Sequence, residues 1–287
     1  MAIFNNQSKS TSSYTNAAKN HASADAIQFD AVSTTGLVGS GFPVTLSHTC
    51  SGGDNRLLVM AIDVFTGATN DITSVTYGGV AMTEAVEREW EGNGFMVFYT
   101  LANPSSGTND VVVSVTGPGE LYEGVVTALS YTGCKQAVPE ASNETGGTGT
   151  ALSTSVTTVT DYDWLVALWV LPSAIGVTLT DGSNYTTRAS DGLGMKRYVG
   201  DSNGSVGTAG LKSQTASINI SREWDVIQIA IAPASAASEW GNQNKSTYTT
   251  GYFLRETGDR ILQESNFGIL LESGGSVASQ WSNLVKS

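Results

Sequence analysis

Few residues of this chain are equipped for acid, base or nucleophilic chemistry. There are two histidines: His21 in a polar N-terminal stretch, and His48 two positions before Cys50. Side chains alternate along a strand, so His48 and Cys50 are expected on the same face. Such a pair is either a base beside a nucleophile or a structural histidine beside a small buried thiol. The sequence has no G-x-S-x-G, H-E-x-x-H or phosphate-loop motif, so we predict that the protein is not an enzyme.

A second group of candidate residues is acidic and surrounds a tryptophan. Glu87, Glu89 and Glu91 flank Trp90, and Asn93 follows, in a segment predicted to be a loop. An exposed indole beside acids and an amide can stack on a sugar and bind its hydroxyls, and the acids can collect Ca²⁺. Alternatively, Trp90 folds back onto the body of the protein. We keep Trp90 and Asn93 as candidate glycan contacts and predict no metal site.

Two further pairs leave their chemistry open. Asp161 and Asp163 form another carboxylate pair, but a glycosidase needs two such groups facing each other across a sugar, which the spacing does not place. Cys50 and Cys134 are far apart and are either free thiols or a disulfide. The chain contains no C-x-x-C motif or Cys/His cluster, so structural zinc is excluded and no cofactor is expected.

The elements that would position these residues are predicted to be strands. Only 14% of residues are charged, 32 are glycine, and the apolar runs are short and rich in β-branched and aromatic residues. Glycine-rich and Asn/Asp-rich turns separate these runs, and the segment Gly146 to Gly149 is predicted to be a loop. Strands are predicted at 27–32, 44–49, 57–65, 74–77, 95–101, 110–116, 124–131, 153–160, 164–171, 195–200, 215–220 and 225–232.

The pattern predicts an all-β fold, namely a two-sheet antiparallel sandwich resembling a jelly roll, over residues 26–233. The runs 57–62 and 164–171 are nearly continuous, which predicts central strands covered on both faces or lying at an oligomer contact. Trp164 and Trp169 are five positions apart and are expected on opposite faces.

The two ends of the chain differ from the middle in composition. Residues 1–25 are polar and are predicted to be an extended arm. Residues 234–287 begin with a small-residue linker, and their runs at 260–264 and 268–272 predict a small β-hairpin, which needs a second surface for stability. The segment 6–11 recurs at 242–247 with aromatic neighbours. The predicted assembly-interface residues are Phe4, Asn6, Gln7, Lys9, Tyr14, Trp240, Asn242, Gln243, Lys245, Tyr248, Phe253, Phe267 and Trp281.

Charge and hydropathy narrow the class of partner. The net charge is −12 and the isoelectric point is near 4.5, so the attraction that gives most affinity for phosphate backbones is missing and nucleic acid is not an expected partner. No run reaches the length of a membrane span, and the first 26 residues lack the apolar segment of a secretory signal, so neither membrane insertion nor Sec-type export is expected.

Four stretches carry a resemblance to a known class of module: 46–59, 74–83, 98–107 and 128–133. Together they resemble a sandwich module of phage structural proteins and bacterial surface proteins, over about residues 26–233. The repeated terminal segments are similar to short tails of phage virion proteins. The resemblance implies a β-sandwich without catalytic residues.

These observations together predict a non-enzymatic virion structural protein of a tailed bacteriophage, either a head decoration or a tail-associated subunit. It would be made in the host cytoplasm and bind copies of itself and other virion proteins through its terminal arms. The alternative is a carbohydrate-binding or adhesive module of a phage fibre or bacterial surface filament, with a host-surface glycan as ligand. Whether the protein sits on head or tail, and with what symmetry, is left open.

Overall fold

The structure is a computed structural model that describes residues 26–38, 43–65, 72–90, 94–115, 123–192, 195–234, 261–263 and 269–271. Within these ranges every regular element is a strand and all strand pairs are antiparallel, which confirms the predicted all-β class. The chain divides into two compact units, and the boundary along the sequence lies between Ala237 and Ser238. We call the described residues of the first unit, from 26 to 234, the body.

The first half of the body forms two sheets. One contains five strands in the order β1-β9-β3-β7-β6, and the other contains four in the order β2-β8-β4-β5. The strands are β1 (Gln28–Thr34), β2 (Val44–Cys50), β3 (Leu57–Phe65), β4 (Ile72–Tyr77), β5 (Val80–Ala81), β6 (Thr83–Trp90), β7 (Gly94–Ala102), β8 (Gly107–Val115) and β9 (Glu123–Thr132).

The second half forms one six-stranded sheet. Its two longest strands, β10 and β15, each run through both layers of this half. Its order is β10-β15-β11-β14-β13, and β12 also pairs with β15. The first part of β10 pairs with the last part of β15, and after a register shift at Gly149 the second part pairs with the beginning of β15. The strands are β10 (Ala141–Thr158), β11 (Trp164–Leu171), β12 (Leu179–Asp181), β13 (Thr186–Asp191), β14 (Lys196–Asp201) and β15 (Gly210–Ile231).

The two halves have the same strand order. The two parts of β10 take the places of β1 and β2, the two parts of β15 take those of β8 and β9, and β11, β12, β13 and β14 correspond to β3, β4, β6 and β7. Even an irregularity is shared, because β6 and β13 each shift register at the third residue of the strand, between Glu84 and Val86 and between Thr187 and Ala189. The body is therefore a structural repeat.

The repeat explains the continuous apolar runs. Leu57, Val59 and Ala61 of β3 face a core that also contains Val166 and Leu168 of β11. The residues between them on each strand face a second core, which differs for the two halves. Both central strands are therefore covered on both faces, as predicted, and the halves meet through the same face of their central sheets.

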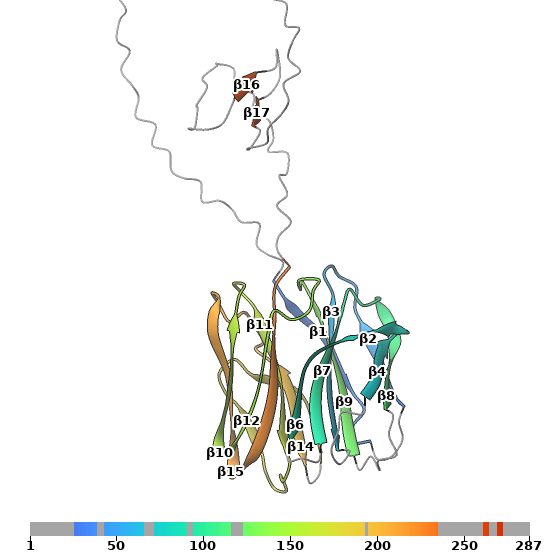
Figure 1. Ribbon diagram of the computed structural model, residues 1–287, viewed down its shortest axis with the longest axis vertical. Coiled ribbons are helices and arrows are strands. Elements are labelled where there is room, and N and C mark those ends of the chain that lie inside the picture. Colours follow the sequence, from blue (N-terminus) through green and yellow to red (C-terminus); the bar gives the residue numbers. More distant parts are fainter. Residues whose placement is uncertain are drawn as a thin grey trace, which may run out of the picture. The chain divides into compact units, whose positions relative to one another are not determined.

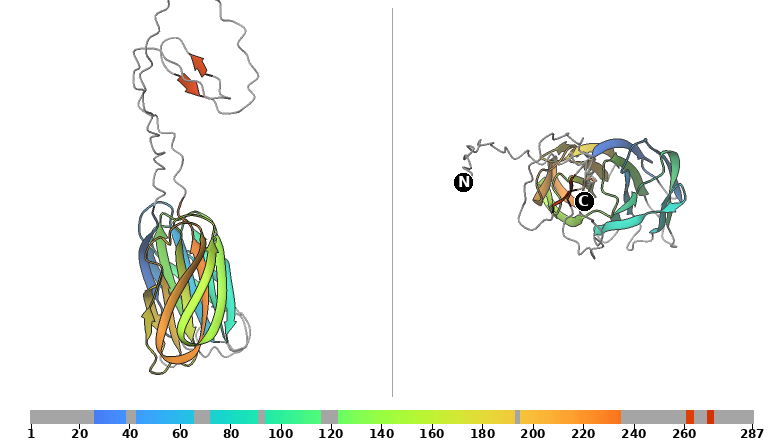
Figure 2. Two further views of the ribbon diagram at one scale, coloured as in Figure 1. Left: turned by 90° about the vertical axis from the view of Figure 1, so that its left-hand side faces the viewer. Right: turned by 90° about the horizontal axis from the view of Figure 1, so that it is seen from above.

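The stack contains more layers than the predicted two sheets. Figure 1 shows the β10-β15-β11 sheet on the left, the β3-β7-β9 sheet in the middle and the β2-β4-β8 sheet on the right, and Figure 2 shows the two halves side by side from above. The two-sheet prediction treated all twelve runs as one sandwich, whereas the strands form two similar sandwich-like halves. Gly146 to Gly149, predicted to be a loop, belongs to β10.

In the second unit the structure describes one antiparallel pair, β16 (Ile261–Gln263) with β17 (Ile269–Leu271). These strands fall within the two runs predicted to form a hairpin. The predicted N-terminal arm, residues 1–25, lies outside the described residues.

Candidate functional site

The seam between the two halves brings charged side chains together inside the body. Asp63 of β3 and Arg197 of β14 are 1% and 2% exposed, and the Arg197 guanidinium donates through Nε to Asp63 Oδ2. Trp90 Nε1 donates to the other Asp63 oxygen at 2.9 Å. Because a buried charge is costly without a partner, this pair ties a residue of one half to a residue of the other.

A second ion-pair cluster crosses the seam at its edge. Arg88 of β6 donates through Nε to Asp225 Oδ1 of β15 at 2.7 Å and is also paired with Glu144 of β10. Burial raises the pKa of the Asp225 carboxyl, and the neighbouring guanidinium acts in the opposite direction. Arg88 thus bridges the halves at a partly solvated position.

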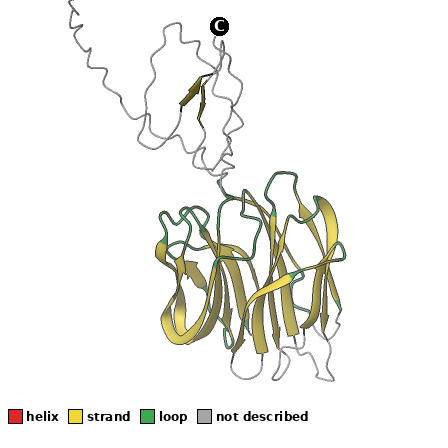
Figure 3. Cartoon of the chain, turned by 45° about the horizontal axis from the view of Figure 1, so that its top comes forward, coloured by secondary structure: helices red, strands yellow, loops and turns green. Residues whose placement is uncertain are grey.

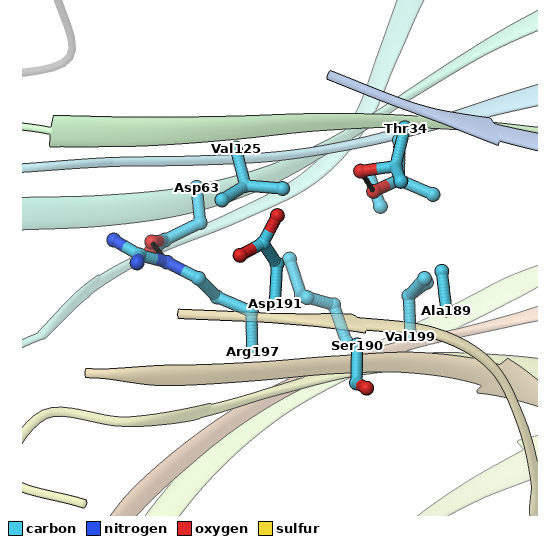
Figure 4. A pocket seen from close by; sticks show the side chains of 11 residues that line it. Thr34, Asp63, Val125, Ala189, Ser190, Asp191, Arg197 and Val199 are labelled. Atoms are coloured by element: carbon cyan, nitrogen blue, oxygen red, sulfur yellow. Dashed lines mark hydrogen bonds and ion pairs between the residues drawn. The ribbon is translucent and has the colours of Figure 1, made fainter. Parts of the chain in front are cut away.

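The seam also contains a small cavity, seen from close by in Figure 4. The space open to the centre of a water molecule is about 10 Å³, which is about the room for one water. A substrate does not fit. The cavity is lined by Thr34, Ala61, Asp63, Val125, Thr127, Leu168, Ala189, Ser190, Asp191, Arg197 and Val199.

The structural repeat accounts for this cavity. By strand register, Asp191 occupies in the second half the position that Arg88 occupies in the first. Val125 and Thr34 likewise occupy the positions of the two acids that Arg88 binds. A short aspartate thus replaces a long arginine, and a valine and a threonine replace the two acids, so space remains.

A third cluster joins aromatic and charged groups of the two halves. Arg188 pairs with Asp201 through two nitrogens, each at 2.9 Å, and its guanidinium lies 4.0 Å from the centre of the Phe29 ring. Tyr131 donates to the same Asp201 carboxylate at 3.1 Å. Burial raises the pKa of Tyr131 well above its usual value, and the Asp201 charge adds to this, so the phenol stays protonated and acts as a donor.

Trp90 is not an exposed loop residue. It ends strand β6, is 1% exposed, and stacks on Phe65 with ring centres 5.6 Å apart. The indole is therefore a core residue, as in the alternative of a tryptophan that folds back, and its faces are not free to stack on a sugar. Asn93 and Glu91 lie outside the described residues. The prediction of an exposed Trp90 is wrong, because the indole is buried and donates to the buried carboxylate of Asp63. The prediction of a glycan contact stays open.

His48 and Cys50 do share a strand face, and both are buried. His48 Nδ1 lies 3.0 Å from Ser33 Oγ, and burial lowers the pKa of the imidazole. Burial likewise raises the pKa of the Cys50 thiol, which disfavours the nucleophilic thiolate. The geometry is that of a structural histidine beside a buried thiol.

Three further predictions concern the two cysteines, the two tryptophans of β11 and the assembly residues. Cys50 and Cys134 are free thiols in different cores. Trp164 and Trp169 lie on opposite faces of β11, and both are buried. The predicted assembly residues from Phe4 to Tyr14 and from Trp240 to Trp281 lie outside the described residues, so that prediction stays open.

The charged residues of the seam were missed in the sequence, although a signal was present. Asp63 interrupts the apolar run of β3, and Asp225 precedes the alternating isoleucines of β15. An acid within a run that is otherwise buried implies a buried partner. The sequence does not say which arginine supplies it.

Three further observations concern metal binding, membrane spans and similarity to known proteins. Among the described residues, no group of three or more His, Cys, Asp or Glu side chains is arranged to hold a metal ion. In the same part of the chain, no helix is long and apolar enough to cross a membrane. The sequence matches no model of a known protein family and no curated protein sequence.

Proposed function

We propose that this protein is a non-enzymatic structural protein of a tailed-phage virion, a head decoration or tail-associated subunit, whose body is attached to the particle through the terminal segments. The body then acts as a rigid displayed element, and neighbouring copies and other virion proteins are its partners. This proposal keeps nucleic acid out of the partner set because the chain carries a net charge of −12. It keeps membrane insertion out because no apolar run has the length of a membrane span.

The observation that supports it most is that both ends of the body lie at the same end of the sheets. Gln28 at the start of β1 pairs with Thr132, and Ala234 donates its backbone N–H to the Gly133 carbonyl at 2.8 Å. Figure 3 shows the strands running the length of the body with loops at both ends. The described part of the body therefore begins and ends at one end of the sheets, and we propose that this end faces the particle.

The finer fold supports the same proposal. In the first half the pairs β1·β9, β2·β8, β3·β7 and β4·β5 are the pairs of a hairpin wound into a jelly roll, and the second half repeats all of them but the last. We propose that each half is a jelly roll. This architecture is frequent in viral capsid and lectin domains. The resemblance to phage structural modules adds to the argument.

The test is to locate the protein on purified particles. An antibody against the body, used in negative-stain microscopy, is expected to label virions at regularly spaced positions. Truncated proteins lacking residues 1–25 or 239–287 are expected to keep the body folded but to lose attachment in a competition assay. Unlabelled particles, or truncated proteins that attach as well as the full chain, would overturn the proposal.

The adhesive alternative depended on an exposed Trp90, and burial removes that support. A glycan array run with the full chain would detect such binding. Tyr162→Ala, which removes an exposed aromatic ring, is the control. Specific glycan binding without particle association would replace our proposal by the adhesive function.

A further inference from the structure

The second half contains a buried carboxyl group that lacks a donor. Asp163 directly precedes β11, is 0% exposed, and neither of its side-chain oxygens accepts a hydrogen bond. Its backbone carbonyl is bound by Val206 N–H at 2.9 Å, so the residue is fixed in place. An ionised carboxylate without a donor is strongly destabilised at such a site, as any unpaired buried charge is.

The neighbouring acid has the opposite environment. Glu140 accepts hydrogen bonds from Val159 N at 2.5 Å, from Thr160 N at 2.8 Å and from Thr160 Oγ1 at 2.6 Å. Burial acts to raise the pKa of Glu140, but the hydrogen bonds from Asp163, Thr160 and Val159 outweigh it and lower the pKa to about 2. Glu140 is therefore the ionised member of the pair.

The backbone brings the two carboxyl groups together, because Glu140 N–H donates to the Ala230 carbonyl at 3.1 Å and Ala230 pairs with Leu165, two residues after Asp163. A hydrogen bond between the two side chains affects the pKa of both. Two carboxylates cannot bond, because neither has a donor, and only a proton on one of them makes the contact favourable. Burial first, and then the bond and charge of Glu140, raise the pKa of Asp163 to about 9. Lys135 acts against this shift and Asp161 adds to it, and the adjoining core cluster of Val156, Leu165 and Ala230 is apolar.

The pair holds a turn that has two unfavourable features. Tyr162 has a φ of +68°, a region that residues other than glycine rarely adopt, and it is 59% exposed. Val159, at the start of the turn, is 73% exposed. The three bonds to Glu140, together with the bond from Tyr162 N to the Gly207 carbonyl at 2.6 Å, compensate for this strain.

We propose that Asp163 and Glu140 share one proton and that this shared proton fastens the turn 159–162 to the body as a conformational latch. Asp163 O–H donates to Glu140, and Glu140 in turn accepts from the turn. When hydroxide removes the proton, two carboxylates face each other in an apolar site. Glu140 then moves towards water, and its contacts to Val159 and Thr160 are lost. This inference does not depend on the proposed function.

The proton can be observed directly in the full-length protein. Infrared spectra of protein with isotope-labelled aspartate are expected to show a protonated carboxyl group at neutral pH. That band is expected to disappear in Asp163→Asn and to remain in Asp161→Asn, a matched control at an exposed acid of the same turn. A neutral-pH spectrum of the wild-type protein without a protonated aspartate would overturn the proposal even if the variants failed to fold.

The latch itself can be followed by hydrogen exchange at the amides of Val159 and Thr160. Once intrinsic exchange is corrected for, their opening is expected to increase about tenfold per pH unit above about pH 9. Asp163→Asn is expected to abolish this dependence, since its amide donates to Glu140 at every pH. If that variant opens with the same pH dependence as the wild-type protein, the proton does not fasten the turn.

Discussion

The outer cores of the two halves occupy equivalent places but have different chemistry. In the second half, Gln228 Nε2 donates to Gln214 Oε1 at 2.9 Å, and Thr154 donates to Gln228 at 3.4 Å, all three side chains being buried. By strand register, the first half has Ala128, Val111 and Leu46 at these positions. One strand order therefore tolerates either an apolar cluster or a hydrogen-bonded polar network at the same positions.

The seam shows the same contrast with a buried ion pair in place of a neutral polar network. The buried pair Asp63 and Arg197 corresponds by register to Val170 and Met96 on the other side of the repeat. A charged pair and an apolar pair thus do the same packing. The difference between them lies in directionality, because the Asp63 carboxylate accepts hydrogen bonds from Arg197 and from Trp90, whereas the apolar pair has no such geometric requirement.

The largest expected effect comes from breaking this pair. Asp63→Val alone or Arg197→Met alone leaves a buried charge and should lower the free energy of unfolding by about 3–5 kcal/mol. The double variant, which copies the apolar pair on the other side, should lose much less than either single variant, although Trp90 then lacks its acceptor. Urea denaturation of the four proteins measures the coupling. A double variant as unstable as the sum of the singles would show that the two sides are not equivalent.

The polar network should respond in the same way but less strongly. Gln228→Ala removes the donor to Gln214 and leaves a cavity, so a loss of about 2–3 kcal/mol is expected. The triple variant Thr154→Leu, Gln214→Val and Gln228→Ala copies the first half and should recover part of that loss. The measurement is again the midpoint and slope of urea unfolding, and no recovery would mean that the surroundings in the second half reject an apolar filling.

A third difference between the halves concerns a strand pair in which a glycine faces a larger residue, because the glycine lies on opposite strands in the two halves. Trp224 of β15 faces Gly147 of β10, whereas in the first half Gly124 of β9 faces Val38. A Cβ atom on Gly147 would lie 2.8 Å from the Trp224 ring, so Gly147→Ala should cost about 1–3 kcal/mol through overpacking. Gly52→Ala, with no atom within 4 Å, is the control for thermal unfolding. Equal melting temperatures would contradict the assignment.

The smallest effect concerns pH and the first half alone. Burial lowers the pKa of His48 below its usual 6.5, so the native state binds fewer protons than the unfolded state. This contribution to stability is present above about pH 6.5 and is lost as the pH falls through the native pKa. Asp30, whose charge acts to raise the His48 pKa, limits the loss. His48→Gln should flatten the acid limb of a plot of stability against pH, and an unchanged limb would exclude His48 as the cause.

The sequence by itself determined the class of fold and most strands of the body. Alternating and continuous apolar runs, together with β-branched residues and turn signals, are local properties, so the positions of β2, β3, β9 and β11 follow from them. The same reasoning placed Trp164 and Trp169 on opposite faces, since a strand alternates whatever surrounds it.

Tertiary structure alone decided the rest. The acidic strand β6 and the glycine-rich first part of β10 have weak strand propensity and become strands because β7 and β15 offer them hydrogen-bonding partners. Trp90 turned inward because Asp63, 27 residues away, accepts its N–H bond. The two-fold use of one strand order, and the pairing of Asp63 with Arg197 across 134 positions, depend on which faces meet in space, and no local pattern encodes that.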